Sequence, residues 1–289
     1  MNILGTGLSG LVGSRVVELL ASHYSFENLS LETGVDITDR KSVNSFFSRS
    51  SAPWVFHFAA YTDVQGAEKE KSLGEKSMAW KVNVTATSNI IENCKRQEKH
   101  LLYIDTDYSF DGTRKSYTEE DAANPLGWYA TTKYEGAKRV LAMGNLGLVV
   151  RIANPYRANP VGKKDFVHKM RERLETGQSV IAATDQLFSP TFIDDIAVAV
   201  DVLVKRNLSG LYHATGGDGL SPFDAARTIA VVYGYDEKLV VPTKFSQMFA
   251  NRAPAPQYAY LKNEKIGELG VTMRTFHEGV EEVKRQEIV

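Results

Sequence analysis

A tyrosine and a lysine four positions apart, Tyr129 and Lys133, lie close to the start of an expected helix. One helical turn places such a pair on the same face. A phenol has an ordinary pKa of about 10, so it needs a nearby ammonium to stabilise its anion before it can give up a proton near neutral pH. Thr106 ends an expected strand, where its hydroxyl can bond the same substrate oxygen. These three side chains predict proton donation to a carbonyl oxygen.

The same spacing occurs twice more, in Tyr134/Lys138 and Tyr258/Lys262. Tyr134 belongs to the same expected helix as Tyr129 but lies about 140° further round the axis, so the two phenols cannot share one face. The helix that starts near Tyr129 follows a turn, which places its first residues at the end of a sheet where ligands bind. The alternative interpretation is that Tyr129 is only an exposed aromatic residue.

A glycine-rich segment lies between the first expected strand and the first expected helix. Gly7 can adopt backbone angles that a side chain forbids, Gly10 lets the helix start approach a pyrophosphate, and Gly13 allows the helix to pack closely on the strand. The free amides of a helix start bind negative charge. A dinucleotide site is therefore predicted, with a purely structural tight turn as the alternative. Its residues are Thr6, Gly7, Leu8, Ser9, Gly10, Leu11 and Gly13.

An acidic residue that binds the adenosine ribose is expected about 20 residues beyond this loop. Glu32 follows Gly13 by 19 positions. A glutamate there repels a 2′-phosphate, which slightly favours NADH over NADPH, although an exposed loop carboxylate explains Glu32 equally well. Asp36, with Ile37, is a second candidate, on the adenine side. Asp39 has the pattern of a helix N-cap.

Short apolar segments alternate with amphipathic helices, which predicts an α/β fold with a Rossmann-type, doubly wound parallel sheet. We expect this domain to cover residues 1–153, with segments near 191–215 returning to it, and a smaller C-terminal substrate lobe to take up most of 154–289. The expected strands are Asn2–Gly5, Trp54–Ala60, Leu101–Ile104 and Leu146–Ile152, with a weaker one at Asn28–Leu31; the expected helices are Leu11–Leu20, Val84–Arg96 and Tyr129–Met143.

Composition excludes several other classes of protein. The 289 residues are 43% apolar and 24% charged with a net charge of -1, so no general basic field is present to attract nucleic acid. The single cysteine, Cys94, cannot form an internal disulfide or a thiolate zinc cage, and the six histidines lack metal-ligand spacing. No apolar run is long enough to span a bilayer. Without the layout of a secretion signal either, we expect a cytoplasmic protein with no metal.

Further motifs extend along the chain: Ala59–Val64 followed by Ala67-Glu68, Asn83 in a helix, Thr106–Tyr108 followed by Phe110–Gly112, and Asp185-Gln186 with Ser189–Thr191. With the glycine loop, they resemble the extended short-chain dehydrogenases/reductases, and most closely the dTDP-4-dehydrorhamnose reductase branch. The resemblance covers nearly the whole chain.

The resemblance implies an NAD(P)H-dependent reductase of a nucleotide-linked 4-keto-6-deoxy sugar, with hydride transfer to the C4 ketone and Tyr129 as proton donor. Thr106, Tyr129 and Lys133 match the catalytic triad of the family. A homodimer would be typical of the branch. The implied cofactor residues beyond the glycine loop are Phe58, Ala59, Ala60, Tyr61, Asn83, Tyr129 and Lys133, and the implied substrate residues are Thr62, Asp107, Tyr108, Asn154 and Arg252.

The chain departs from the branch at two positions. Asp105 stands where the branch usually has serine, and Asn154 stands where it has a tryptophan that shapes the sugar site. The branch also often carries arginine near Glu32. A basic cluster around Lys163 and Lys164 is either a solvated helix face or a surface that meets a diphosphate.

Three alternative functions remain at this stage. A nucleotide-sugar 4,6-dehydratase resembles this layout but has glutamate at the position of Tyr108. A nucleotide-sugar C4 epimerase is a second enzyme alternative. A non-catalytic dinucleotide-binding protein, similar to the regulatory subunit of methionine adenosyltransferase, would bind cofactor without turnover.

Overall fold

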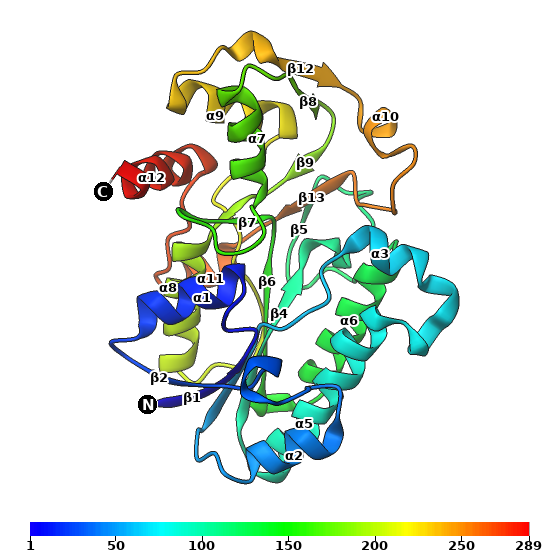
Figure 1. Cartoon of the computed structure of the whole chain (residues 1–289), viewed down its shortest axis with the longest axis vertical. Coiled ribbons are helices and arrows are strands. Elements are labelled where there is room, and N and C mark those ends of the chain that lie inside the picture. The colour runs from blue at the N-terminus through cyan, green and yellow to red at the C-terminus, as the bar shows by residue number, and fades with distance from the viewer. Residues whose placement is uncertain (289) are drawn as a thin grey trace.

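The centre of the molecule is a sheet of six parallel strands in the order β11-β6-β4-β3-β1-β2, seen in a computed structural model that describes residues 1–288 (Figure 1). From β1 the chain moves out to β2 and then returns past β1 to β3, so the direction of winding reverses between β1 and β3. Ligands bind at such a reversal, beyond the carboxyl ends of the strands. The strands are β1 (Asn2–Thr6), β2 (Ser25–Asn28), β3 (Trp54–His57), β4 (His100–Thr106), β6 (Gly147–Ile152) and β11 (Gly210–His213).

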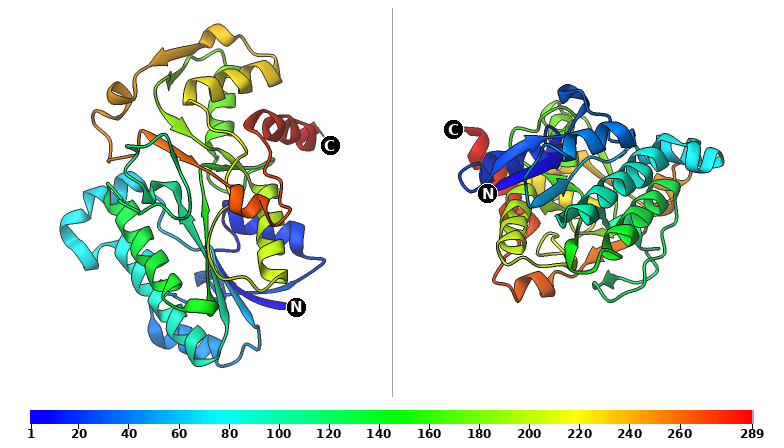
Figure 2. Two further views of the ribbon diagram at one scale, coloured as in Figure 1. Left: turned by 180° about the vertical axis from the view of Figure 1, so that it is seen from behind. Right: turned by 90° about the horizontal axis from the view of Figure 1, so that it is seen from below.

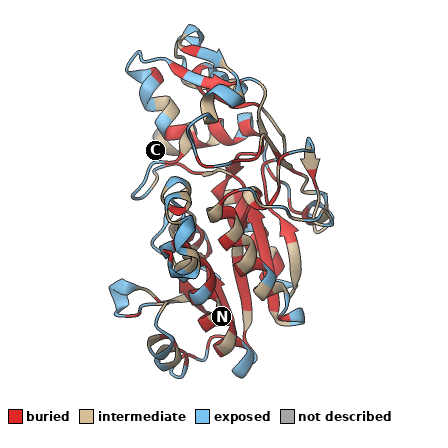
Figure 3. Cartoon of the chain, turned by 90° about the vertical axis from the view of Figure 1, so that its right-hand side faces the viewer, coloured by how far each residue is buried: buried red, intermediate tan, exposed pale blue. Residues whose placement is uncertain are grey.

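Helices cover both faces of this sheet (Figures 1 and 2). Successive strand residues point to opposite faces, so Ile3 packs in an apolar cluster with α1 and α8, while Leu4 packs in a second cluster with α2, α5 and α6. Figure 3 shows the strands buried between these layers. The doubly wound, Rossmann-type sheet is thereby confirmed. The covering helices are α1 (Leu11–Leu20) and α8 (Ile193–Lys205) on one face, and α2 (Arg40–Phe47), α5 (Ala86–Arg96) and α6 (Trp128–Leu141) on the other.

A second, smaller group of elements stands beyond the carboxyl ends of the strands, at the top of Figure 1. It has its own apolar cluster, which includes Tyr156, Phe188 and Phe276. The chain returns from this lobe to add β11 beside β6. The lobe contains the helices α7 (Phe166–Glu175), α9 (Pro222–Tyr233), α10 (Phe245–Phe249) and α12 (Phe276–Ile288), and the strands β7 (Pro155–Tyr156), β8 (Val180–Ala183), β9 (Leu187–Phe188), β10 (Thr191–Phe192), β12 (Val240–Thr243) and β13 (Tyr258–Leu261).

The remaining short elements connect the two parts: α3 (Val64–Lys69), α4 (Met78–Trp80), β5 (Ser116–Tyr117) and α11 (Glu264–Gly267). β5 pairs with β13 in a small sheet that also includes β9. Within residues 1–288, none of the helices combines the length and apolar character that would let it cross a membrane. The boundary at residue 153 stays a prediction.

The expected strand Asn28–Leu31 is wrong in position. The strand is Ser25–Asn28, and Leu31–Thr33 forms a 3-10 turn. Ser30 and Thr33 exchange capping hydrogen bonds at this turn, and Leu31 is 77% exposed, so the local caps outweigh its apolar side chain. The expected strand Trp54–Ala60 ends earlier, at His57.

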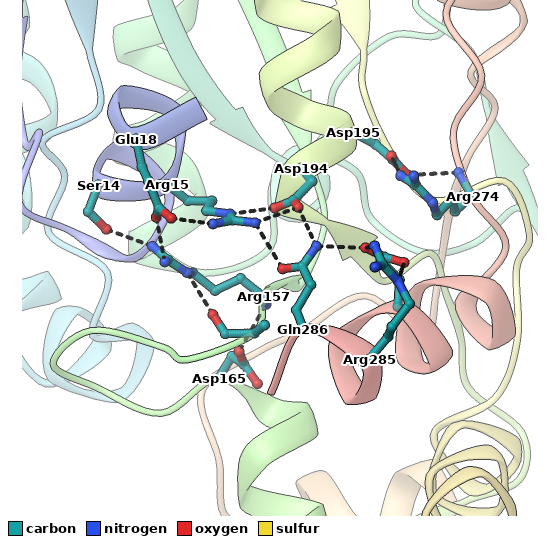
Figure 4. Close-up of polar contacts among 12 residues, drawn as sticks. Ser14, Arg15, Glu18, Arg157, Asp165, Asp194, Asp195, Arg274, Arg285 and Gln286 are labelled. Carbon is teal, nitrogen blue, oxygen red and sulfur yellow. Dashed lines mark hydrogen bonds and ion pairs between the residues drawn. The ribbon is translucent and has the colours of Figure 1, made fainter. Parts of the chain in front are cut away.

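Polar side chains fasten the smaller lobe to the first helix of the sheet (Figure 4). Arg15 on α1 donates to both carboxylate oxygens of Asp194 on α8, at 2.7 Å each, and to the side-chain oxygen of Gln286 on α12 at 2.8 Å. Arg157, in the segment that leaves β7, donates to the hydroxyl of Ser14 at 3.0 Å. This junction therefore fixes how the smaller lobe sits over the strand ends.

Candidate active site

A cavity of about 720 Å³ opens where the two lobes meet, beyond the carboxyl ends of β1, β3, β4 and β6. Three distant parts of the chain form its wall: the glycine loop, the ends of the central strands with the start of α6, and the segment that leads into α7. The residues are Gly7, Ser9, Gly10, Leu11, Val12, Gly13, Phe58, Ala59, Ala60, Thr62, Val64, Ile104, Asp105, Thr106, Asp107, Tyr108, Tyr129, Lys133, Ile152, Asn154, Pro155, Val161, Gly162, Lys163, Lys164 and Phe166.

The glycine loop has the close contacts that its sequence suggests. Gly7 has φ +66°, and a Cβ there would lie 2.5 Å from the backbone nitrogen of Ala59. A Cβ on Gly13 would lie 2.3 Å from the carbonyl oxygen of Gly7. The bare backbone at these positions brings the start of α1 against the cavity, where its amides can meet an anionic group. The loop therefore fits a dinucleotide pyrophosphate.

The start of α6 is capped by a residue from another helix, α3. Its N-cap residue, Gly127, has no side chain to cap the helix, and the Glu68 carboxylate of α3 accepts from the Trp128 amide at 2.7 Å instead. A carboxylate at this place also complements the helix dipole. Tyr129, the next residue, reaches the cavity wall, whereas Tyr134 does not.

Lys133 is buried, and its ammonium donates to the carbonyl oxygen of Ile104 at 2.6 Å. It also lies 4.0 Å from the centre of the Tyr103 ring, a cation–π contact. Burial lowers the pKa of Lys133 to about 8, against the opposing charge of Asp105. Part of the lysine population is therefore neutral already at mildly alkaline pH.

The pKa values of Asp107 and of the phenols of Tyr108 and Tyr129 shift upward. Burial raises the pKa of Tyr129, while a hydrogen bond with Thr106 lowers it, and the net effect keeps the phenol protonated at neutral pH. Burial also raises the pKa of Asp107 to about 7, although the Thr106 hydroxyl donates to its carboxylate at 3.0 Å. The rings of Tyr108 and Tyr129 meet edge to face at 5.9 Å. Tyr129 thus keeps its phenol proton at neutral pH, one helical turn along α6 from the buried Lys133.

Asn83 and Thr6, both predicted to bind the cofactor, make hydrogen bonds to residues around the cavity. The side-chain oxygen of Asn83 accepts from the Tyr61 amide at 2.8 Å, and its nitrogen donates to Thr132 of α6 at 2.9 Å. The Thr6 hydroxyl contacts the ring of His57 at 2.6 Å and accepts from the Ala59 amide. Thr6, Tyr61 and Asn83 are not among the wall residues.

The predicted ribose and adenine residues also lie outside the cavity wall. Glu32 is exposed on the 3-10 turn beyond β2. The Asp36 carboxylate accepts from the amide and hydroxyl of Thr38, and Ile37 packs against the apolar cluster under α2. Leu8 is buried instead of facing the cavity.

β2 ends at Asn28, a residue that the sequence analysis passed over. Its side-chain oxygen is buried and has no partner among residues 1–288. The end of this strand, four residues before Glu32, is where a dinucleotide ribose is bound in Rossmann folds. Correct placement of the strand would have drawn attention to it.

Four of the five predicted substrate residues, Thr62, Asp107, Tyr108 and Asn154, line the cavity. The fifth, Arg252, is exposed on the loop after α10 and lies outside the wall, although its charge lowers the pKa of Tyr108 against a larger effect of burial. The wall also includes Lys163 and Lys164, for which the sequence left two interpretations open, and Asp105. Within residues 1–288 no group of three or more metal-ligating side chains is arranged around a common point.

Comparison with known proteins identifies relatives of the whole chain. The family model described as "RmlD substrate binding domain" matches residues 1–288. The dTDP-4-dehydrorhamnose reductase of Mycolicibacterium smegmatis is 32% identical over 286 residues, covering 97% of this chain and 84% of that protein.

Two solved structures extend the likeness to three dimensions. A dTDP-4-dehydrorhamnose reductase from Clostridium acetobutylicum superposes with a TM-score of 0.90 at 29% identity, covering all of both chains. Another from Bacillus anthracis, in complex with NADP, has a TM-score of 0.88 at 26% identity and covers 99% of each chain. The family predicted from the motifs is confirmed: the chain belongs to the family of the RmlD substrate binding domain, an extended short-chain dehydrogenase/reductase family to which dTDP-4-dehydrorhamnose reductases belong.

Proposed function

We propose that this protein is an NAD(P)H-dependent reductase of a nucleotide-linked 4-keto-6-deoxy sugar. The observation that carries the proposal is that Thr106, Tyr129 and Lys133 line the same cavity as the glycine loop. A dinucleotide bound on that loop and a ketone beside the phenol would thus share one cavity. The family relatives named above are reductases, which favours this function over epimerisation and over a regulatory role.

The residues present fit a nicotinamide dinucleotide. Gly7, Gly10 and Gly13 line the cavity at the start of α1, where the helix amides would meet its pyrophosphate, and Lys133, in the same wall, would hold the nicotinamide ribose. When bound, the dinucleotide supplies the hydride that the ketone carbon accepts.

The chain itself provides the proton and the orientation. The Thr106 hydroxyl bonds the ketone oxygen and directs it toward Tyr129, whose protonated Oη then donates its proton to that oxygen. The Lys133 ammonium stabilises the phenolate that remains. Burial keeps the Tyr108 phenol protonated by raising its pKa, so Tyr108 does not take the part of a proton-abstracting glutamate, and dehydration is disfavoured.

We favour NADH over NADPH. The segment from Ser25 to Val35 contains two carboxylates, Glu27 and Glu32, and no lysine or arginine. The 2′-phosphate of NADPH would bring further negative charge to this segment without a cation to balance it. Comparison of the two Kd values, measured by quenching of protein fluorescence, tests this preference: tighter binding of NADPH would refute it.

The substrate side of the cavity contains Asn154 and two consecutive lysines, Lys163 and Lys164. These lysines favour a sugar linked to a diphosphate. With dTDP-4-keto-6-deoxy sugar as substrate, we expect sugar-dependent loss of nicotinamide absorbance.

The decisive variant is Tyr129→Phe, with Tyr134→Phe as its matched control on the same helix. Loss of a positioned proton donor costs about 10²- to 10⁴-fold in turnover, whereas the dinucleotide Kd should stay nearly unchanged. Tyr134→Phe should retain full turnover, because Tyr134 is not part of the cavity wall. Equal activity of Tyr129→Phe and wild type would refute the mechanism. Dinucleotide binding by the wild type without any oxidation would favour a regulatory protein.

A further inference from the structure

A buried ion pair adjoins the Thr106–Tyr129–Lys133 group. Asp105 precedes Thr106 on β4, and its Oδ2 accepts from Arg151 Nε at 2.8 Å and from the Ser109 hydroxyl at 3.0 Å. The side chains of Asp105 and Arg151 are 0% and 3% exposed. A buried pair of this kind is seldom worth its cost in stability alone, so it invites a functional explanation.

The second carboxylate oxygen of Asp105 is uncommitted. Oδ1 is buried and has no hydrogen-bond partner within residues 1–288, although Asp105 forms part of the cavity wall. Buried carboxylate oxygens are normally bonded. Tyr103 and Asp105 are two residues apart on β4, so their side chains lie on the same face of the strand. The Lys133 ammonium lies on this face, 4.0 Å from the centre of the Tyr103 ring, and donates to the carbonyl oxygen of Ile104, between the two residues, at 2.6 Å.

Lys133 is the cation whose pKa this anion affects. Its titratable and charged neighbours come from four elements and one turn: His57 on β3, Tyr103 and Asp105 on β4, Asp107 and Tyr108 in the turn after β4, Tyr129 on α6, and Arg151 on β6. His57 is neutral, since burial and the Lys133 charge lower its pKa to about 3. Tyr129 also stays protonated at neutral pH. Burial, which lowers the pKa of Lys133, and the Asp105 charge, which raises it, have the largest effects on this pKa.

We propose that Asp105 is a positioning residue that keeps the Lys133 ammonium charged, and that Arg151 and Ser109 hold its carboxylate in place for this purpose. The catalytic consequence rests on the proposed function, because a neutral lysine could not stabilise the Tyr129 phenolate. With the carboxylate present, the pKa of Lys133 is about 8. Without it, burial acts unopposed and the lysine loses its proton nearer to neutral pH.

The direct test follows the titration of Lys133 by NMR, using protein labelled with ¹³C at lysine Cε and Lys133→Arg to assign the signal. No substrate or dinucleotide is needed. In Asp105→Asn we expect the pKa of Lys133 to fall by about one unit or more. Ser109→Ala is the matched control, because it removes one hydrogen bond to Asp105 but no charge, and it should shift the pKa by far less. An unchanged pKa in Asp105→Asn overturns the proposal.

The same variants test the catalytic consequence. The alkaline fall of kcat, expected near pH 8 in the wild type, should move to lower pH by the same interval in Asp105→Asn, while KM at pH 6 changes little. A uniform loss of kcat at all pH values would mean a merely structural role and would also overturn the proposal. Failure of the proposed function would abolish turnover in every variant and leave the NMR result intact.

Asp105→Asn leaves Arg151 as an unpaired buried charge and risks misfolding. Asp105→Asn/Arg151→Met removes both charges together and keeps the packing volume. Loss of the Arg151 charge raises the pKa of Lys133, but the Asp105 charge has the larger effect on it. The double variant should therefore still show a downward shift, smaller than that of Asp105→Asn. A pKa equal to that of the wild type in this folded double variant again refutes the role of Asp105.

Discussion

Replacing Gly7 by alanine tests whether the glycine loop needs its bare backbone. Two costs add at this position. The φ of +66° lies in the left-handed region, which costs an alanine about 1 kcal/mol. The new Cβ would also lie 2.5 Å from the Ala59 nitrogen, a backbone atom just beyond the end of β3 that cannot rotate away. Overpacking of this kind costs about 1–3 kcal/mol. We therefore expect Gly7→Ala to lower the free energy of unfolding by about 2–4 kcal/mol.

Gly144→Ala is the matched control. Gly144 has nearly the same φ, +64°, but a Cβ there would meet no atom within 4 Å. Only the conformational cost of about 1 kcal/mol should remain. Urea unfolding of the two variants separates the steric part from the conformational part, because both change the same chemical group.

The dinucleotide Kd completes the test. If the loop relieves the contact by moving, a loss of about 2 kcal/mol appears in binding as an affinity about 30-fold weaker. Gly144→Ala should bind as the wild type does. The reasoning is refuted if both variants lose the same stability and both keep wild-type binding, because the close approach to Ala59 would then have no energetic weight.

Two further predictions concern the smaller lobe and its junction. Burial lowers the pKa of His168, but hydrogen bonds with Asp165 and Glu287 outweigh burial and raise the pKa to about 9. Because this folded-state pKa exceeds the ordinary value of 6.5, the protonated His168 stabilises the fold fully below pH 6.5. That stabilisation is lost as the pH rises through about 9. The free energy of unfolding should therefore decline between these pH values in the wild type and less so in His168→Gln, and parallel declines would contradict the assignment. Arg15→Met removes three hydrogen bonds that join α1 to α8 and α12 and should cost about 1–3 kcal/mol. Arg40→Met, which breaks an exposed pair with Glu92, should lower the stability far less, because solvent screens an exposed ion pair. Equal unfolding midpoints in urea for the two variants would show that the junction adds nothing.

Several features of this protein are predictable from local sequence alone. The first strand, the glycine loop and α1 follow one another within 20 residues, and their periodicity and special backbone angles depend only on near neighbours. The spacing of Tyr129 and Lys133 likewise depends on a single helix. The parallel sheet follows from alternation of strands and helices. By contrast, the strand expected at Asn28–Leu31 was wrong because capping interactions, rather than hydrophobicity, decide the backbone there.

The remaining features depend on the path of the chain in space. Asp105 and Arg151 are 46 residues apart and meet only because β4 and β6 pair in register. Lys163 and the glycine loop lie far apart in the sequence but line the same cavity. The helices, most strands and the reacting side chains can be predicted from the amino-acid order, since they depend on residue type and on spacing along a few turns of chain. The charges that surround Lys133 are known only from the folded chain, because buried electrostatic effects depend on distances between strands that the linear order does not specify.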